Sequence, residues 1–204
     1  MGKPARSRLP PADRKAALLG HAIGCFADHG LARATQAQVA ARAGVSVSAV
    51  YSYFRTRADL VAAVLHHVEA AIEAMVEAAT AAPGPADAVL TGLARQTAGM
   101  AATQPDLVRV WLDWSAGVRA ETWPRFLELQ KRLQGRVATI LSRSPDSPGD
   151  PSDPRLASAA RLFVGGAHTL ALMHFERVSE PEREIFITQM VEGSLAALKA
   201  QGPA

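Results

Sequence analysis

The sequence has little of several residue types that define particular protein classes. One cysteine in 204 residues excludes an intrachain disulfide, and nothing points to an oxidising compartment. Cys25 lies between Ile23 and Phe26 in a helical pattern, so we expect a buried apolar side chain rather than a reactive thiol. Aromatic residues make up only 5%, and no segment alternates apolar with polar residues. Both features disfavour a β-sheet.

Long apolar runs and a high charge content are also missing. No stretch approaches the ~20 apolar residues of a membrane span, and no apolar run of signal-peptide length follows the basic N-terminus. Charged residues make up 20% and hydrophobic residues 49%, which excludes a disordered chain and permits a large core. We therefore expect a globular cytoplasmic protein with no membrane partner.

Catalytic and metal-binding motifs are not found either. The sequence contains no nucleophile elbow, no phosphate-binding glycine loop and no zinc-ligand spacing. His66 and His67 precede Glu69 and Glu73, but adjacent histidines on a helix point about 100° apart, which is poor geometry for a metal. We expect surface residues there, no metal, no cofactor and no enzyme activity.

The sequence does contain repeated helical patterns rich in alanine, leucine and valine, which predict an all-α protein of about nine helices. Residues 83–85 (PGP) and 144–154 (SPDSPGDPSDP) break the pattern and are expected to be loops. The residues expected to cap or start helices are Asp13, Thr35, Ser46, Thr56, Pro105, Thr122, Asp153 and Ser179.

Charge is divided unevenly along the chain. Residues 1–66 hold nine positive and three negative side chains, a net +6, whereas the remainder holds thirteen and sixteen, a net −3. A basic N-terminal part on an acidic body indicates a polyanion-binding module joined to a second module with another role.

Residues 35–54 (TQAQVAARAGVSVSAVYSYF) have the pattern of a helix-turn-helix. Val39, Ala40 and Ala43 give the first helix an apolar inner face. Gly44 stands where the turn needs a positive φ, and we expect Val45 to fill the turn from inside. The second helix places Val50, Tyr53 and Phe54 inward.

The outward positions of the second helix are small: Val47, Ser48, Ala49 and Ser52. Small side chains let a helix approach base edges in the major groove, which is about 12 Å wide. An alanine-rich helix pair with a glycine turn can also arise by chance. Arg55 and Arg57 follow the motif where phosphate contact is natural, and this favours DNA binding.

The sequence resembles the TetR family of transcriptional regulators. The resemblance lies in residues 41–46 (ARAGVS), 51–54 (YSYF) and 59–60 (DL). Residues 3–11, 45–68 and 108–124 are further similar to the LuxR/HapR-type quorum-sensing master regulators, a branch of that family. The similarity covers much of residues 3–135 and fades after the loop at 144–154.

The resemblance implies a DNA-binding domain over residues 1–56 and an effector-binding and dimerisation domain over 57–204. It implies a basic arm with Arg6 and Arg8 in the minor groove, major-groove positions at Ser48, Ala49 and Ser52, and backbone contacts from Gln36 and Gln38. Ser52 stands where the branch usually has Asn, so a bidentate amide contact to adenine is lost. The predicted DNA-contacting residues are Arg6, Arg8, Thr35, Gln36, Gln38, Ser46, Val47, Ser48, Ala49, Tyr51, Ser52, Tyr53, Arg55 and Arg57.

The resemblance also implies a cavity for a small apolar effector between the fourth, fifth, seventh and eighth helices. Trp111 can stand on its wall or be an ordinary core residue, whereas we expect Trp114 and Trp123 to be core residues. Gln130 and Gln134 would be polar contacts for the effector. The predicted lining residues are Ile72, Met75, Val76, Trp111, Phe126, Leu129, Gln130, Leu133, Gln134, Ala167 and Leu170.

Asp113 lies between two tryptophans and must be solvated or paired, so we expect an ion pair with Arg109 or Arg119. The last two helices are rich in apolar residues, and Gly165 and Gly166 permit close packing. They can pack within one chain only or form a four-helix bundle with a second copy.

The sequence therefore predicts a homodimeric regulator, as a repressor, that reads a palindromic DNA operator with two helices about one turn apart. Its DNA affinity would change with the effector. An architectural DNA-binding protein with a filled body is the alternative, which a cavity near Trp111 and Gln134 would disfavour.

Overall fold

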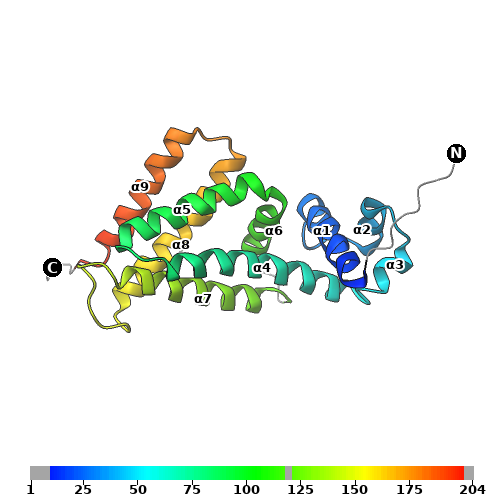
Figure 1. The fold of residues 1–204 in the computed structure, drawn as a ribbon, viewed down its shortest axis with the longest axis horizontal. Coiled ribbons are helices and arrows are strands. Elements are labelled where there is room, and N and C mark those ends of the chain that lie inside the picture. The colour runs from blue at the N-terminus through cyan, green and yellow to red at the C-terminus, as the bar shows by residue number, and fades with distance from the viewer. Residues whose placement is uncertain (1–9, 118–120, 200–204) are drawn as a thin grey trace.

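The computed structural model describes residues 10–117 and 121–199, and every regular element in these two ranges is a helix (Figure 1). The all-α prediction with about nine helices is confirmed. The helices are α1 (Pro11–His29), α2 (Gln36–Ala43), α3 (Val47–Tyr51), α4 (Arg57–Ala81), α5 (Ala86–Thr103), α6 (Pro105–Ala116), α7 (Trp123–Leu141), α8 (Pro154–Phe175) and α9 (Glu180–Ala196).

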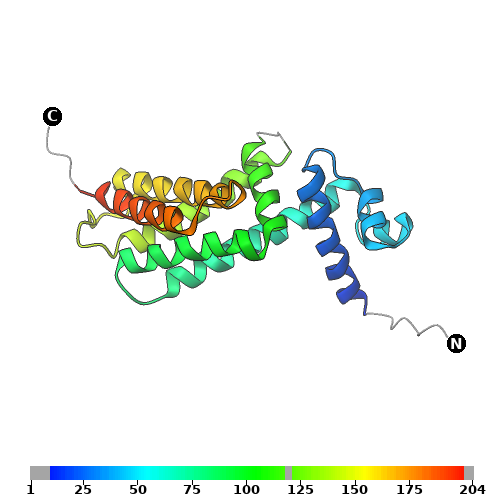
Figure 2. The same cartoon turned by 90° about the horizontal axis from the view of Figure 1, so that it is seen from above.

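The helices form a small head and a larger body (Figure 1 and Figure 2). Helices α1–α3 make up the head at one end of the molecule. Helix α4 starts beside the head and runs along the body next to α7, while α5, α8 and α9 complete the body. Helix α6 lies where the body meets α1. Two helices, α4 and α6, therefore connect the head with the body.

Local sequence accounts for most of the helix starts. Thr35, Thr56 and Ser179 each form a capping box with the residue three positions on, which satisfies backbone N–H groups that the helix leaves free. The expected cap at Asp13 is wrong because α1 already begins at Pro11, whose missing N–H suits the first helical position. Thr122 makes no cap bond either, because its backbone is helical (φ −114°, ψ −17°).

The head has its own apolar core, in which Phe26, Val39, Val50 and Phe54 are at most 2% exposed. Cys25 is buried beside them, as expected, and burial raises the pKa of its thiol. Since the thiolate is the reactive form, this environment disfavours thiol chemistry. The core fixes α2 and α3 relative to α1.

Charged residues join α4 to α7 along the body. Glu69 accepts hydrogen bonds from Arg125 at 2.5 Å and from Arg132, and Arg132 also pairs with Glu73 at 2.6 Å. Glu69 is only 12% exposed at its side chain, so this network is more than a surface ion pair. It holds α4 against the body over several turns.

The tryptophans expected in the core are placed there. Trp114 is fully buried, donates its Nε1–H to the Thr122 carbonyl at 3.1 Å, and meets Phe126 edge to face. Trp123 is half-buried and stacks on Phe126 with ring centroids 5.1 Å apart.

Helix α8 is the one described helix that is long and apolar enough to cross a membrane, judged by length and composition. One such helix is weak evidence, since core helices of soluble proteins have the same properties. Here Leu156, Ala159, Phe163 and Leu170 of α8 belong to the body core. Packing inside the body therefore accounts for part of its apolar character, while Leu162 and Leu172 are exposed.

Candidate nucleic-acid interface and ligand cavity

Helix α3 lies at the outer end of the head, opposite the body (Figure 1). Gly44 takes the left-handed conformation (φ 64°, ψ 33°) between α2 and α3, as the turn requires. The prediction that Val45 fills this turn from inside is wrong, because the side chain is 40% exposed. Val50 alone anchors α3 from within, at 0% exposed.

The outer face of α3 presents small hydroxyl and apolar groups to solvent. Val47, Ser48, Tyr51 and Ser52 are exposed, with Val47 40% and Tyr51 48% accessible. The Ser52 hydroxyl donates to the Ala49 carbonyl at 2.7 Å. Ser52 therefore offers an outside group its oxygen lone pairs, not its proton.

Ser46 begins α3 as its N-cap, since its hydroxyl accepts from the Ala49 N–H at 3.2 Å. It also lies 3.0 Å from the Ser48 hydroxyl. Ala49 is half-buried, so this predicted contact residue has less accessible surface than Ser48 beside it. The start of α3 is thus both capped and open to solvent.

Two predicted DNA-contacting residues point into the protein instead. Gln36 is 6% exposed and donates its Nε2–H to the Phe54 carbonyl at 2.6 Å. Arg57 donates to the Ala34 carbonyl at 3.0 Å and to the Leu31 carbonyl, so it ties the start of α4 to the α1–α2 loop. Both side chains satisfy buried backbone carbonyls that a loop leaves unpaired, and that need outweighs contact with an outside phosphate.

The other predicted contact residues lie around α2 and after α3. Thr35 and Gln38 are joined in the capping box but remain at the surface, Tyr53 is half-buried against the head core, and Arg55 is exposed. Arg6 and Arg8 lie outside the described residues. The accessible candidates are therefore Thr35, Gln38, Ser46, Val47, Ser48, Tyr51, Ser52 and Arg55.

Replacing Gln36 by methionine tests its structural role. The change keeps the side-chain volume but leaves the buried Phe54 carbonyl without its donor, which should lower the free energy of unfolding by about 1–3 kcal/mol. Chemical denaturation measures this. The same change at exposed Gln96 on α5 is the control and should alter stability little. Unchanged stability of Gln36→Met would contradict the role.

Polar contacts tie the head to α6. The Asp113 carboxylate accepts from the Leu31 backbone N–H at 2.7 Å, at the end of α1. Arg42 of α2 pairs with Asp28 at 2.5 Å and lies 3.9 Å from Asp106 at the start of α6. Arg109 does not pair with Asp113 as expected; it pairs with Asp106, one helical turn away, at 3.2 Å. The other expected partner, Arg119, lies outside the described residues.

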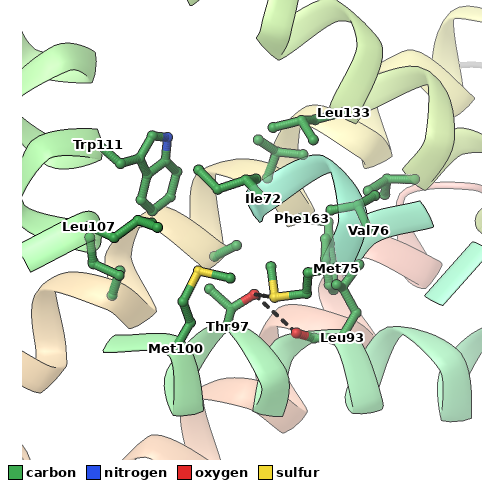
Figure 3. A pocket seen from close by; sticks show the side chains of 15 residues that line it. Ile72, Met75, Val76, Leu93, Thr97, Met100, Leu107, Trp111, Leu133 and Phe163 are labelled. Carbon is green, nitrogen blue, oxygen red and sulfur yellow. Dashed lines mark hydrogen bonds between the residues drawn. The ribbon is translucent and has the colours of Figure 1, made fainter. Parts of the chain in front are cut away.

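The body encloses an apolar cavity of about 40 Å³ between α4, α5, α6, α7 and α8 (Figure 3). Six of the eleven predicted residues line it: Ile72, Met75, Val76, Trp111, Leu133 and Ala167. Trp111 lines the cavity and also belongs to the buried core, so both alternatives considered for it describe part of its position. The remaining lining residues are Leu93, Thr97, Met100, Leu107, Val108, Val137, Phe163, Val164 and Ala171.

Five predicted lining residues do not reach the cavity. Phe126 packs against the rings of Trp114 and Trp123. Leu129 and Leu170 are fully buried in other parts of the core. Gln130 and Gln134 are half-buried on α7 but are not part of the lining, so the cavity lacks the two polar contacts predicted for it. The lining face of α7 is that of Leu133 and Val137, four residues apart.

The prediction placed the fifth helix beside the cavity and Trp111 on its wall, but it named no residue of α5 and no other residue of α6. Leu93, Thr97 and Met100 follow one another at helical spacing of four and three residues on α5, and on α6 Trp111 lies four residues after Leu107 and three after Val108. This periodicity is visible in the sequence. It marks a buried face without saying whether that face meets a cavity or another helix.

No group of three or more metal-ligating side chains occurs within the ranges 10–117 and 121–199. Glu69 and Glu73, considered above as metal ligands, form ion pairs with arginines of α7. His66 and His67 on the same helix are exposed, as expected.

An exposed short helix after a capped turn, on a head joined to a cavity-bearing helical body, is the arrangement of a DNA-binding regulator. Residues 18–64 match the family described as bacterial regulatory proteins, tetR family. Residues 18–64 therefore carry a TetR-family DNA-binding domain, and the proteins that share it are transcriptional regulators.

Two kinds of similarity extend beyond the head. The HTH-type transcriptional regulator LuxR of Vibrio harveyi is 28% identical over 199 residues, 97% of this chain and 95% of that protein, which agrees with the branch named from the sequence. A TetR-like regulator from Rhodococcus sp. RHA1 superposes with a TM-score of 0.77 at 18% identity, covering 93% and 99% of the two chains. The FadR regulator of Bacillus subtilis, in complex with stearoyl-CoA, gives 0.70 at 16% identity, covering 89% and 98%.

Proposed function

We propose that this chain binds a palindromic DNA operator as a homodimer in the cytoplasm, acts as a repressor, and responds to a small apolar molecule in the body cavity. The observation that carries the proposal is the outer face of α3, which is exposed, free of acidic side chains and rigidly supported from within. Residues 1–56 are the DNA-binding domain, and residues 57–204 are the effector-binding and dimerisation domain.

The composition of the α3 face supports major-groove binding. Serine hydroxyls and a valine can approach base edges closely, and Arg55 directly after α3 can reach a phosphate. Ser52 offers acceptor lone pairs, and the hydrogen-bonded Ser46 and Ser48 hydroxyls keep one proton between them for an outside acceptor, so base contacts would come from hydroxyls instead of amides. Nonspecific affinity would come from the net +6 of residues 1–66.

The α8–α9 surface supports dimerisation. Leu162 and Ile185 are 50% and 58% exposed there, beside an open groove of about 470 Å³ that Gly165, Phe186 and Gln189 help to line. Within the chain, Gly166 already gives room to Met190, because an added Cβ would lie 2.3 Å from its sulfur. Gly165 has open space around it and is the glycine that a second copy could approach. Covering these apolar side chains would provide the hydrophobic contribution that stable dimers need.

Helix α6 supports a route from the cavity to the head. Trp111 stands on the cavity wall, and Asp113 two residues later accepts from Leu31 of the head. A ligand that shifts α6 would therefore act on α1 and change the relative position of two heads in a dimer. Such a ligand regulates only if it binds the DNA-competent and incompetent states with different affinity.

Replacing Asp113 by alanine tests this route. A compound that raises the melting temperature of the unaltered protein should still bind, but its effect on DNA affinity should fall from the typical ~5–150-fold toward none. Fluorescence anisotropy with labelled DNA, with and without the compound, measures it. Asp87→Ala, an exposed carboxylate in the first turn of α5, is the control and should keep the effect. If the compound changed the DNA affinity of Asp113→Ala as much as that of the unaltered protein, the contact between Asp113 and Leu31 would not transmit the effect.

Selection of bound sequences from a random DNA pool tests the proposed function as a whole. The expected result is an inverted repeat whose half-sites lie about one helical turn, ~10 base pairs, apart. Absence of any enriched sequence would favour the architectural alternative, and an enriched single half-site would contradict the dimer.

A further inference from the structure

The indole of Trp111 carries a hydrogen-bond donor that no described residue satisfies. Trp111 is 6% exposed, and its Nε1–H is buried without an acceptor. The neighbouring Trp114 shows the usual situation, since its Nε1–H donates to the Thr122 carbonyl at 3.1 Å. A buried indole N–H normally has a partner, because leaving it unpaired is unfavourable. The unpaired donor therefore points to a group that binds here.

The indole that carries the donor is part of the cavity wall, but neighbouring side chains cover the nitrogen itself, so a ligand reaches it only when the cavity widens. Figure 3 shows the indole entering from α6, with its nitrogen edge turned toward Ile72 and Leu133, both of which line the cavity. The ring cannot easily turn away, because His168 of α8 meets it edge to face with ring centroids 5.0 Å apart. The direction of the N–H is thus set by the packing of α6 against α8.

The rest of the lining restricts the ligand to uncharged molecules. No charged side chain lines the cavity, and an ion buried without a counter-ion is strongly unfavourable. Thr97 is the one polar side chain besides Trp111 in the lining, and its hydroxyl donates to the Leu93 carbonyl at 3.0 Å. Burial lowers the pKa of His168, so that ring behind Trp111 is neutral at pH 7. Apolar surface and one free donor remain.

We propose, on the basis of the ligand-binding role proposed above, that the cavity takes a small, uncharged, mostly apolar molecule with one carbonyl oxygen, which accepts the Trp111 Nε1–H. The cavity of about 40 Å³ must widen for such a molecule. Met75 and Met100 both line it, and their flexible thioether chains can change rotamer at low cost. The carbonyl oxygen of the ligand would fix its orientation in the cavity, and burial of its apolar part would provide most of the binding affinity.

Three matched aromatic probes test the chemistry. Acetophenone carries a ketone oxygen, α-methylstyrene replaces that oxygen by a methylene group of similar shape, and benzoate carries a charge. Calorimetric titration of the full chain should give an affinity for acetophenone on the order of tenfold above that for α-methylstyrene, the gain from pairing a buried donor, with benzoate weakest. In ¹⁵N-labelled protein, the indole cross-peak missing from Trp111→Phe should move downfield with acetophenone and not with α-methylstyrene.

The variant Trp111→Phe should bind the two neutral probes equally, and the spectra of the unaltered protein give an independent answer if this variant is unstable. Equal affinities with no indole shift in the unaltered protein would overturn the acceptor while leaving the cavity as a ligand site. Tightest binding of benzoate would overturn the uncharged class. Binding of none of the probes would overturn this inference; DNA binding by the dimer would stand, and it is tested separately by the random-pool selection.

Discussion

Replacing Ser48 by glutamate should reduce the affinity for the selected DNA by at least about a hundredfold, because a carboxylate facing phosphates and base edges costs several kcal/mol. Ser48 is exposed on the outer face of α3, so the change needs no rearrangement of the head. A carboxylate in the first turn of a helix is also favourable for folding. Fluorescence anisotropy at fixed salt measures the affinity, since protein–DNA affinities depend strongly on salt.

The matched control for this variant is Thr139→Glu. Thr139 is exposed on α7, far along the chain from the head, and the substitution changes the net charge equally. It should lower DNA affinity only slightly, through the overall charge. Equal losses in both variants would mean that charge alone matters, and undiminished binding by Ser48→Glu would remove α3 from the interface.

Replacing Leu162 by glutamate should convert the proposed dimer into monomers and lower DNA affinity by at least about a hundredfold. Leu162 is 50% exposed on α8 and lines the α8–α9 groove, so each copy would bury an unpaired carboxylate in the apolar interface. A monomer has one head and loses the gain in effective concentration that two linked heads have. Sedimentation equilibrium and DNA titration measure the two effects.

The chain offers a close control for this variant. Leu127 on α7 is 49% exposed, nearly the same as Leu162, but lies outside the groove. Leu127→Glu should leave both the dimer and the DNA affinity unchanged. If Leu162→Glu remained dimeric, or if both variants dissociated alike, the α8–α9 surface would not be the interface.

Local chemistry made the helix boundaries and the helix-turn-helix predictable. Thr56 with Asp59, and Ser179 with Glu182, satisfy their own helix ends within four residues, so the sequence contains both partners. Gln36 and Arg57 show the limit. Their partners are the carbonyls of Phe54, Ala34 and Leu31, which only the folded head brings near, so both residues appeared equally suited to DNA contact.

The cavity shows a second limit of the same kind. Helical periodicity identifies the buried face of α7, but Leu129 and Leu133 both lie on it, and only Leu133 meets the cavity. The difference depends on where α5 and α6 cross α4, and that crossing is a tertiary property. The link from Asp113 to Leu31 spans 82 positions and was likewise beyond local reasoning.

The most direct test of the central claim inserts five base pairs between the two selected half-sites. Five base pairs are about half a turn of DNA, so the second half-site rotates to the opposite face and the two heads of one dimer cannot both reach it. We expect the affinity to fall toward that for a single half-site. An insertion of ten base pairs returns the second half-site to the same face but lengthens the separation of the half-sites by ~34 Å, so it should also weaken binding. Affinity that is unchanged by the five-base-pair insertion would contradict a dimer whose two α3 helices read the operator together.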